Sequence, residues 1–332
     1  MLNPLATHAG VRRLITAAGA APSVHNTQPW RFEVRRGRYI ELHADLDRRL
    51  HVADPRGRSM SISCGAALFN LRLAMRVAGM RPVVQPMSAA GSGPSALSPD
   101  LPSDLPPTLL AAVWPADAVP ASAAEYELYE AVKVRRTNRL PFSGDPVPVE
   151  VMAELAAAAR IEGASLVEVG GTAAAALLEE VAAADEALTV DRDYRLELAR
   201  WTAGNSRSDG IPSYVQGPRP VGDPAPVRDF ARARGERARF EPHPRLAVLT
   251  TRGDGPADWL RAGQALQRVL LAATLHGVSA SFLNQPLDLR DMRHRTDPRH
   301  PGGHPQMIIR LGYGAAVPRA PRRPVPELLR AA

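Results

Sequence analysis

Apolar and polar residues near the N-terminus follow first a helical pattern and then a strand pattern. Apolar side chains recur at three- and four-residue intervals over about 7–20, which predicts an amphipathic helix. The segments WRFEV and YIELHAD alternate around Arg36-Gly37, which predicts two strands joined by a turn. A more continuously apolar helix is expected over about 61–78, ending at Gly79, and the strand RPVVQP follows it.

Helices and strands continue to alternate after a change of composition. Residues from about 87 to 107 are rich in Ser, Ala, Gly and Pro, which indicates a loop or linker. TLLAAVWP is typical of a short strand, 115–122 is again linker-like, and a helix is expected over about 123–134. Helix, loop, strand and helix then recur, with RLAVLTT and QMIIRLGYG as strands. The pattern therefore predicts an α+β protein.

Two of the helical segments resemble each other in sequence. CGAALFNLRLAMRVAGM (64–80) aligns without a gap with AGQALQRVLLAATLHGV (262–278), at a constant offset of 198 positions that pairs Gly65 with Gly263. Two Ala- and Leu-rich helices can resemble each other by chance. The shared terminal glycine and the apolar strand that follows each helix favour a duplication instead, because a shared period indicates repeated units. We therefore expect two tandem halves, 1–120 and 121–332, packed about a pseudo-twofold axis.

Composition narrows the class of protein further. The 332 residues are 45% hydrophobic, which is enough for one large domain or two ordinary ones. No long apolar run or signal-peptide pattern is visible, and Cys64 is the single cysteine, so we expect a cytoplasmic protein without a membrane partner. The net charge of +7 comes almost wholly from arginines spread along the chain, so no nucleic-acid partner is expected.

Two polar motifs stand at different places in the two halves. APSVHNTQPWRF (21–32) follows the first helix, whereas the matching place in the second half, LAAAARIEGASLVEV, has no such motif. VRRTNRLPF (134–142) precedes the helix of the second half, where the first half has only LNPLATHAG. In an extended segment Arg135, Thr137 and Arg139 share a face, and two guanidinium groups around a hydroxyl suit a phosphate. A solvated basic loop is the alternative.

These motifs, together with the C-terminal GY…P…RRP, resemble the FMN-dependent nitroreductase family, and their placement in one chain resembles its fused, Acg-like branch. The resemblance covers most of the chain outside about 87–107 and 203–239. It implies a three-layer α/β/α sandwich whose two halves form an intramolecular pseudo-dimer. Members are normally homodimers, in which one chain provides an arginine clamp for the FMN phosphate and the other provides the Pro-Ser loop.

The resemblance also implies roles for individual residues. Arg135 and Thr137 would bind the FMN phosphate with Arg322, and Arg139 would approach the pyrimidine edge of the flavin ring. The implied cofactor-binding set is Arg135, Arg136, Thr137, Arg139, Arg322, Pro22, Ser23, Asn26, Gln28, Ser281, Phe282, Leu283 and Asn284. Two departures from the family pattern are Ala320, where a basic residue is common, and Asn284, where an acidic residue is common.

The implied function is transfer of hydride from NAD(P)H, a transient reductant, through FMN to a nitroaromatic, quinone or similar small-molecule acceptor. One clamp and one loop make one site, so we expect one FMN per chain and no catalytic side chain. The alternatives are an FMN-sequestering protein whose segment 201–237 forms a lid, and a specialised flavin oxidase or dehydrogenase. The chain is expected to be a monomer with an internal pseudo-dimer or to dimerise further.

No metal site is expected from the sequence. His294, His300 and His304 are loosely spaced in a proline-rich loop, and no cluster of cysteines or carboxylates accompanies them. Cys64 begins an apolar helix and is expected in the core. His25 is expected either to pack within its loop or to face a substrate.

Overall fold

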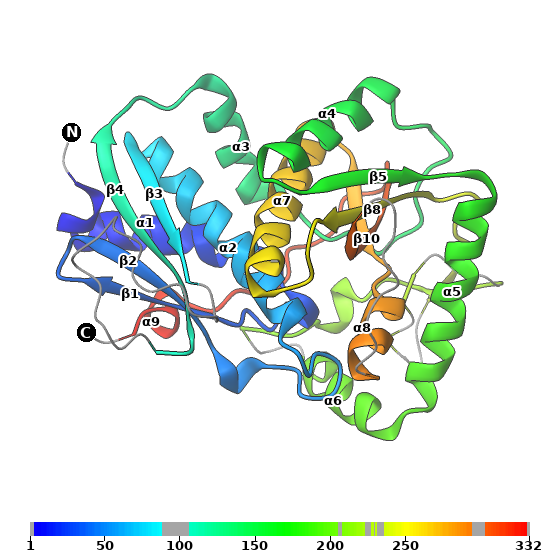
Figure 1. The fold of residues 1–332 in the computed structure, drawn as a ribbon. Helices are drawn as coiled ribbons and strands as arrows, with labels where there is room; N and C mark the ends of the chain where they lie inside the picture. The colour runs from blue at the N-terminus through cyan, green and yellow to red at the C-terminus, as the bar shows by residue number, and fades with distance from the viewer. Residues whose placement is uncertain are drawn as a thin grey trace.

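The computed structural model describes residues 3–87, 106–204, 208–222, 227–228, 230, 236–293 and 303–330. Two four-stranded antiparallel sheets lie on either side of a central pair of long helices, α2 and α7 (Figure 1). The first sheet has the order β1 (Trp30–Arg35), β2 (Tyr39–Ala44), β4 (Leu109–Ala118) and β3 (Met80–Pro86). The second has the order β5 (Ser165–Val169), β8 (Arg245–Thr251), β10 (His304–Gly312) and β9 (Ser279–Phe282). A short parallel pair joins β6 (Arg219–Pro220) to β7 (Arg237–Ala238).

Helices cover one face of the first sheet and both faces of the second. The α-helices in the described residues are α1 (His8–Gly19), α2 (Arg58–Val77), α3 (Ala123–Val134), α4 (Val149–Ile161), α5 (Gly171–Val190), α6 (Arg192–Thr202), α7 (Pro256–Leu275), α8 (Gln285–Met292) and α9 (Val325–Leu328). Side chains of α1 and α2 form the first core with β1, β2 and β4. The second sheet packs against α4 and α7 on one face and against α5 and α8 on the other. The predicted α+β architecture is confirmed; the second half has the three expected layers, whereas helices cover one face of the sheet in the first half.

Local sequence explains where several helices begin. The Thr7 hydroxyl accepts a hydrogen bond from the Gly10 backbone N–H at the start of α1. Ser122 and Glu125 form a reciprocal capping box at the start of α3. Asp54 accepts from the backbone N–H groups of Ser59 and Met60, so α2 begins at Arg58, three residues earlier than expected.

The two sheets are built in the same order along the chain. In each half two strands precede the long helix, two follow it, and the strand made last lies inside the sheet. Where α2 crosses α7, a Cβ on Gly65 would clash with the Leu260 carbonyl oxygen, and a Cβ on Gly263 would clash with that of Ile62. The offset of 198 positions exchanges these two contacts, as a twofold axis requires. This reciprocity supports the duplication, and the boundary near residue 120 stays a prediction.

The halves differ in what joins their strands. A turn at Arg36-Gly37 joins β1 to β2, whereas α5, α6 and the residues from 203 to 244, which include β6 and β7, lie between β5 and β8. The C-terminal segment leaves the second half and returns to the first (Figure 1), where Leu329 forms a parallel bridge with Phe32. The Arg330 backbone N–H also donates to the Phe32 carbonyl at 2.8 Å. One polypeptide therefore ties both halves together at its end.

The sequence predicted two linkers, at 87–107 and at 115–122. Residues 115–118 belong to β4, and Pro115 pairs with Pro82 of β3, so the prediction of a linker there was wrong. The prolines are tolerated because β2 pairs with β4 only as far as Val113, so Pro115 has a strand on one side alone. The linker expected at 87–107 lies mostly outside the described residues. None of the described helices is long and apolar enough to cross a membrane.

Candidate functional site

The loop after α1 has an unusual backbone. His25, Asn26 and Gln28 have φ values of 46°, 55° and 49°, a left-handed conformation that is uncommon outside glycine. The Ser23 hydroxyl accepts from the Gln28 backbone N–H at 2.9 Å, and the Ser63 hydroxyl of α2 accepts from the Val24 backbone N–H at 3.1 Å. Strained backbone persists where surrounding contacts fix it, and it is frequent at functional sites.

Two polar side chains of this loop bind other parts of the chain. Asn26 donates to the Gly210 carbonyl at 2.9 Å and to the Pro321 carbonyl at 3.1 Å. Gln28 donates to the Ser208 carbonyl at 2.9 Å and accepts from the Arg323 backbone N–H at 2.8 Å. Gln28 is fully buried and lines neither pocket described below, so its side chain supports the loop instead of facing a ligand.

The RRTNR segment is held in an extended form by its own asparagine. The Asn138 backbone N–H donates to the Ala280 carbonyl at 2.9 Å, and its side-chain amide donates to Ser279 and Ala315. Thr137 forms a parallel bridge with Ala280 beside β9. Asn138 is thereby buried on one side, while Arg135, Thr137 and Arg139 all line the site. The three alternate residues thus line the site as expected, but Arg136 between them lines the basic pocket as well.

Four arginines gather at one end of the site, in what we call the basic pocket. It is lined by Arg135, Arg136, Thr137, Arg319 and Arg322, together with Asn26, the Pro-Ser step, apolar residues and a fifth arginine, Arg139, which also lines the larger pocket. Within the described residues, none of these four arginines has an acidic ion-pair partner. An anionic ligand would supply the missing charge.

Two of these guanidinium groups have buried nitrogen atoms with hydrogen-bonding capacity left over. Arg135 is 5% exposed, and its Nε and Nη1 atoms have no partner in the part of the chain that the structure describes; the same holds for Nε of Arg322. Burial, and then repulsion from the neighbouring arginines, lowers the pKa of Arg135 to about 10 and that of Arg322 to about 9. Both groups remain cations at neutral pH and need an anion nearby.

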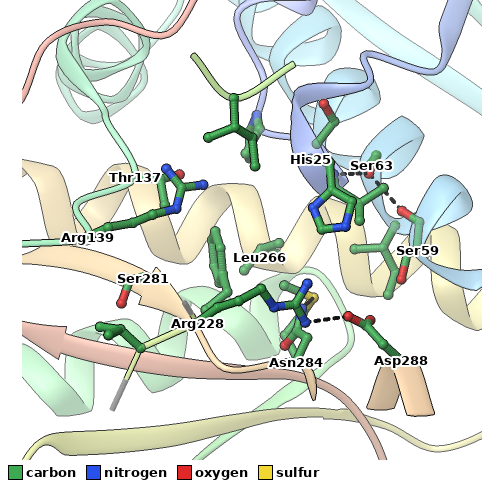
Figure 2. A pocket seen from close by; sticks show the side chains of 18 of the residues that line it. His25, Ser59, Ser63, Thr137, Arg139, Arg228, Leu266, Ser281, Asn284 and Asp288 are labelled. Atoms are coloured by element: carbon green, nitrogen blue, oxygen red, sulfur yellow. Dashed lines mark hydrogen bonds and ion pairs between the residues drawn. The ribbon is translucent and has the colours of Figure 1, made fainter. Parts of the chain in front are cut away.

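A larger pocket adjoins the basic one; the space among its lining residues is about 860 Å³, part of which is open to solvent. The two pockets share five lining residues, Pro22, Ser23, Thr137, Arg139 and Ile211. Figure 2 shows Arg139 and Thr137 on one side of the larger pocket, His25 with Ser59 and Ser63 on the other, and Arg228 reaching across toward Asp288. Both halves of the chain therefore build its wall.

The structure brings most of the predicted cofactor-binding residues together at these two pockets. Those lining the larger pocket are Pro22, Ser23, Thr137, Arg139, Ser281, Phe282 and Asn284, and those lining the basic pocket are Pro22, Ser23, Asn26, Arg135, Arg136, Thr137, Arg139 and Arg322. Gln28 and Leu283 line neither. The Leu283 side chain is fully buried in the core beside α5, and its backbone N–H donates to the Ile308 carbonyl.

Several lining residues were not predicted from the sequence. Arg228 donates to Asp288 of α8 at 2.6 Å inside the larger pocket, and Phe230 lies 5.4 Å from the Arg139 guanidinium. Neither Arg228 nor Asp288 belongs to a sequence motif. The two residues are 60 positions apart in the chain and meet only in the folded protein. The presence of an insertion in one half only was the available indication.

His25 faces the larger pocket, one of the two placements expected for it. Burial lowers the pKa of His25 well below its ordinary value, and the positive charges of Arg228 and Arg139 act in the same direction. The imidazole is therefore neutral at physiological pH.

Part of the expected lid, 201–237, forms pocket wall. We call residues 208–217 the strap. Ile211 of the strap lines both pockets, and the Val215 carbonyl accepts from Arg139 at 2.9 Å. Arg48 of the first half donates to Asp209 at 2.8 Å. Together with the bonds from Asn26 and Gln28, these contacts fix the strap against both motifs. Whether it covers a flavin stays a prediction.

The remaining candidates lie apart from the site. Cys64 is in the core as expected, where burial raises the pKa of its thiol and its Sγ contacts the Pro29 carbonyl. His294 and His300 lie outside the described residues, and His304 begins β10.

Comparison with known proteins identifies the family. Residues 132–313 match the model of the Nitroreductase family. The chain is 31% identical over 329 residues to Rv3131 of Mycobacterium tuberculosis, named as a candidate NAD(P)H nitroreductase, covering 96% of this chain and 90% of the relative. It is 29% identical over 333 residues to the candidate NAD(P)H nitroreductase acg of the same organism, covering 96% and 94%.

Solved structures were also matched. FMN-dependent nitroreductase NfnB from Mycobacterium smegmatis, in complex with NADPH, is 20% identical with a TM-score of 0.37 and covers 63% of this chain and 99% of its own. A nitroreductase with bound FMN from Bacteroides fragilis is 16% identical with a TM-score of 0.33, covering 57% and 89%. On the family match and the full-length relatives, the chain belongs to the nitroreductase family.

Proposed function

We propose that this protein binds FMN across the two joined pockets and reduces a small-molecule acceptor with NAD(P)H. The observation that carries the proposal is the pair of guanidinium groups, Arg135 and Arg322, with buried nitrogen atoms that lack partners within the described chain. A phosphate monoester offers oxygens and negative charge to both groups. The names of the mycobacterial relatives and the FMN-bound members of the family support this choice of ligand.

The residues present fit such a cofactor from end to end. Arg135, Arg322 and the Thr137 hydroxyl would hold its phosphate in the basic pocket. The larger pocket would hold its ring, with Pro22 and Ser23 on the wall from the first half. Arg139 lines both pockets, and burial, followed by repulsion from Arg228, lowers its pKa to about 10. It is a half-buried cation suited to negative charge on the ring.

FMN, when bound, would supply the hydride-transfer chemistry between NAD(P)H and a nitroaromatic, quinone or similar acceptor. The chain itself would bind, orient and exclude water. Ile211, Val227 and Phe230 line the larger pocket and would limit access of water to it. No nucleophilic side chain is needed, which agrees with the inert, buried Cys64.

The first test is the colour of the purified protein and its ability to bind added FMN. A protein that is colourless and does not bind FMN contradicts the proposal outright. Anaerobic addition of NADPH or NADH to the yellow protein should then bleach the flavin absorbance. Arg135→Ala combined with Arg139→Ala should abolish retention of FMN, and survival of retention would place the cofactor elsewhere.

A second function, sequestration of FMN with little turnover, is favoured by the strap. Asn26, Gln28 and Arg48 all bind it, so the site is closed on that side by contacts between the halves. The discriminating measurements are FMN release into a large excess of apoflavodoxin and steady-state turnover with quinones. Slow release together with persistent yellow colour after NADPH addition would favour sequestration; rapid bleaching and turnover would favour the reductase.

A further inference from the structure

The basic pocket has more positive charge than one FMN phosphate can neutralise. Besides Arg139, which also lines the larger pocket and is assigned to the flavin ring, four guanidinium groups line it, and a phosphate monoester carries about −1.5 to −2 charges near neutral pH. About two positive charges are therefore left over when FMN is bound. All four line one pocket, so they are close enough to compete for the same anion. Burial, and then repulsion among the arginines, lowers the pKa of Arg135, Arg136 and Arg322.

The four arginines form an inner pair, Arg135 and Arg322, and an outer pair, Arg136 and Arg319. Arg135 is nearly fully buried, and Arg322 is fixed by Asn26, whose Oδ1 accepts from it at 3.0 Å, and by the Ala20 carbonyl. Arg136 is half-buried, with Nη1 directed at the Lys133 and Arg135 carbonyls.

Arg319 is the fourth member and is exposed, and with Arg136 it forms what we call the rim pair. The rim pair has no acidic partner among the described residues, as noted above. When the inner pair holds a phosphate, the rim pair still faces solvent at the mouth of the site.

We propose that Arg136 and Arg319 bind the adenosine 2′-phosphate of NADPH and make NADPH the preferred reductant. The proposal rests on the proposed function and specifies its reductant. A 2′-phosphate is a second phosphate monoester, NADH lacks it, and arginine is the side chain that accommodates this group in other dinucleotide sites. The basic pocket, in which the rim pair lies, adjoins the larger pocket where the nicotinamide would meet the ring, because the two pockets share Arg139 and Ile211.

The test uses the FMN-loaded protein and measures binding of NADP⁺ and NAD⁺ by calorimetry, separately from turnover. The variants are Arg136→Gln, Arg319→Gln and their combination, with Arg319→Glu as a charge reversal. The matched control is Arg160→Gln, an exposed arginine at the end of α4. The double variant should bind NADP⁺ about tenfold more weakly and NAD⁺ almost unchanged, with its FMN content preserved. Its ratio of kcat/KM for NADPH over NADH should fall by the same factor.

Ionic strength provides a second measurement that needs no substitution. The wild-type preference for NADP⁺ should decrease as salt rises from about 0.05 to about 0.5 M, because exposed charges are screened. The double variant should lack this dependence.

Each other result has a defined meaning. Equal losses of NADP⁺ and NAD⁺ binding, or no loss, would overturn the rim assignment. Loss of FMN from the double variant would show that all four arginines serve the FMN phosphate, which also overturns it. A wild-type chain that retains no FMN contradicts the proposed function itself, and this inference falls with it.

Discussion

Gly65 of α2 and Gly263 of α7 pack so closely that a Cβ added to Gly65 would lie 2.9 Å from the Gly263 Cα, and one added to Gly263 would lie 2.8 Å from the Gly65 Cα. Each also lies over a backbone carbonyl of the facing helix, that of Leu260 or Ile62. Backbone carbonyls cannot rotate away as a side chain can. The distance between the two long helices, and hence between the two walls of the site, is set at this crossing.

Gly263→Ala should therefore destabilise the protein by about 1–3 kcal/mol, the usual range for overpacking a close contact. Gly65→Ala should behave alike, and both should weaken FMN retention because the walls of the site separate. Urea unfolding of the apoprotein and the flavin-to-protein absorbance ratio are the measurements. Gly144→Ala is the control, because nothing lies within 4 Å of a Cβ added there. An equal effect at Gly144 would contradict this account.

Arg135→Met should change stability and cofactor binding in opposite directions. The substitution removes a buried cation with two unsatisfied nitrogen atoms, so the apoprotein should gain about 1–3 kcal/mol. FMN affinity should fall because a phosphate contact is lost. Arg58→Met provides the contrast: Arg58 is equally buried but forms a 2.6 Å ion pair with Asp291, so its loss should destabilise the protein. Loss of stability in both variants would show that Arg135 has a partner in the folded apoprotein.

Each chain should bind one FMN. At the place related to the site by the internal repeat, the sequence has LATHAG instead of the arginine motif and IEGAS instead of the Pro-Ser loop. Flavin released by denaturation, divided by protein from amino-acid analysis, should approach one per chain after saturation with FMN. Light scattering of the same sample would show whether that chain is a monomer or dimerises further. A ratio near two would contradict the assignment of a single complete site.

His25 should make the protein less stable in acid. Its pKa is lowered in the folded state, whereas an unfolded histidine titrates near 6.5. The unfolded chain thus takes up a proton that the folded chain does not, and stability present above pH 6.5 is lost as the pH falls below it. The loss should be about 1 kcal/mol per pH unit.

His25→Asn should reduce this loss, and asparagine tolerates the left-handed backbone there. Urea midpoints at about pH 7.5 and about pH 5.5 measure it. His51→Asn, at an exposed histidine, is the control and should leave the difference as in the wild type. An unchanged pH dependence in His25→Asn would mean that His25 is protonated in the folded protein.

Features set by local spacing could be predicted from the sequence. The helices at 8–19 and 58–77 and the strands around Arg36-Gly37 follow from apolar periodicity and turn residues. The alternation of Arg135, Thr137 and Arg139 follows from the extended backbone alone. The repeat predicted which two helices resemble each other, and the structure packs those two at the centre.

Features that depend on tertiary contacts could not be predicted. Arg228 meets Asp288 only through the path of the inserted segment, which has no counterpart in the first half. Gln28 belongs to the motif, but its side chain hydrogen-bonds to Ser208 and Arg323. Nothing in the motif distinguishes a residue that holds the loop from one that faces the pocket. Leu283, the residue directly after β9, is likewise directed into the core.

The bridge between Leu329 and Phe32 has a consequence for synthesis of the chain. β1 is the outer strand of its sheet, and Leu329 with Arg330 pairs with its free side. Until the ribosome has added Leu329 and Arg330, that edge is open to pairing with any other exposed strand. The half made first thus stays vulnerable to aggregation until the second half has also been made, although most of its core could form earlier.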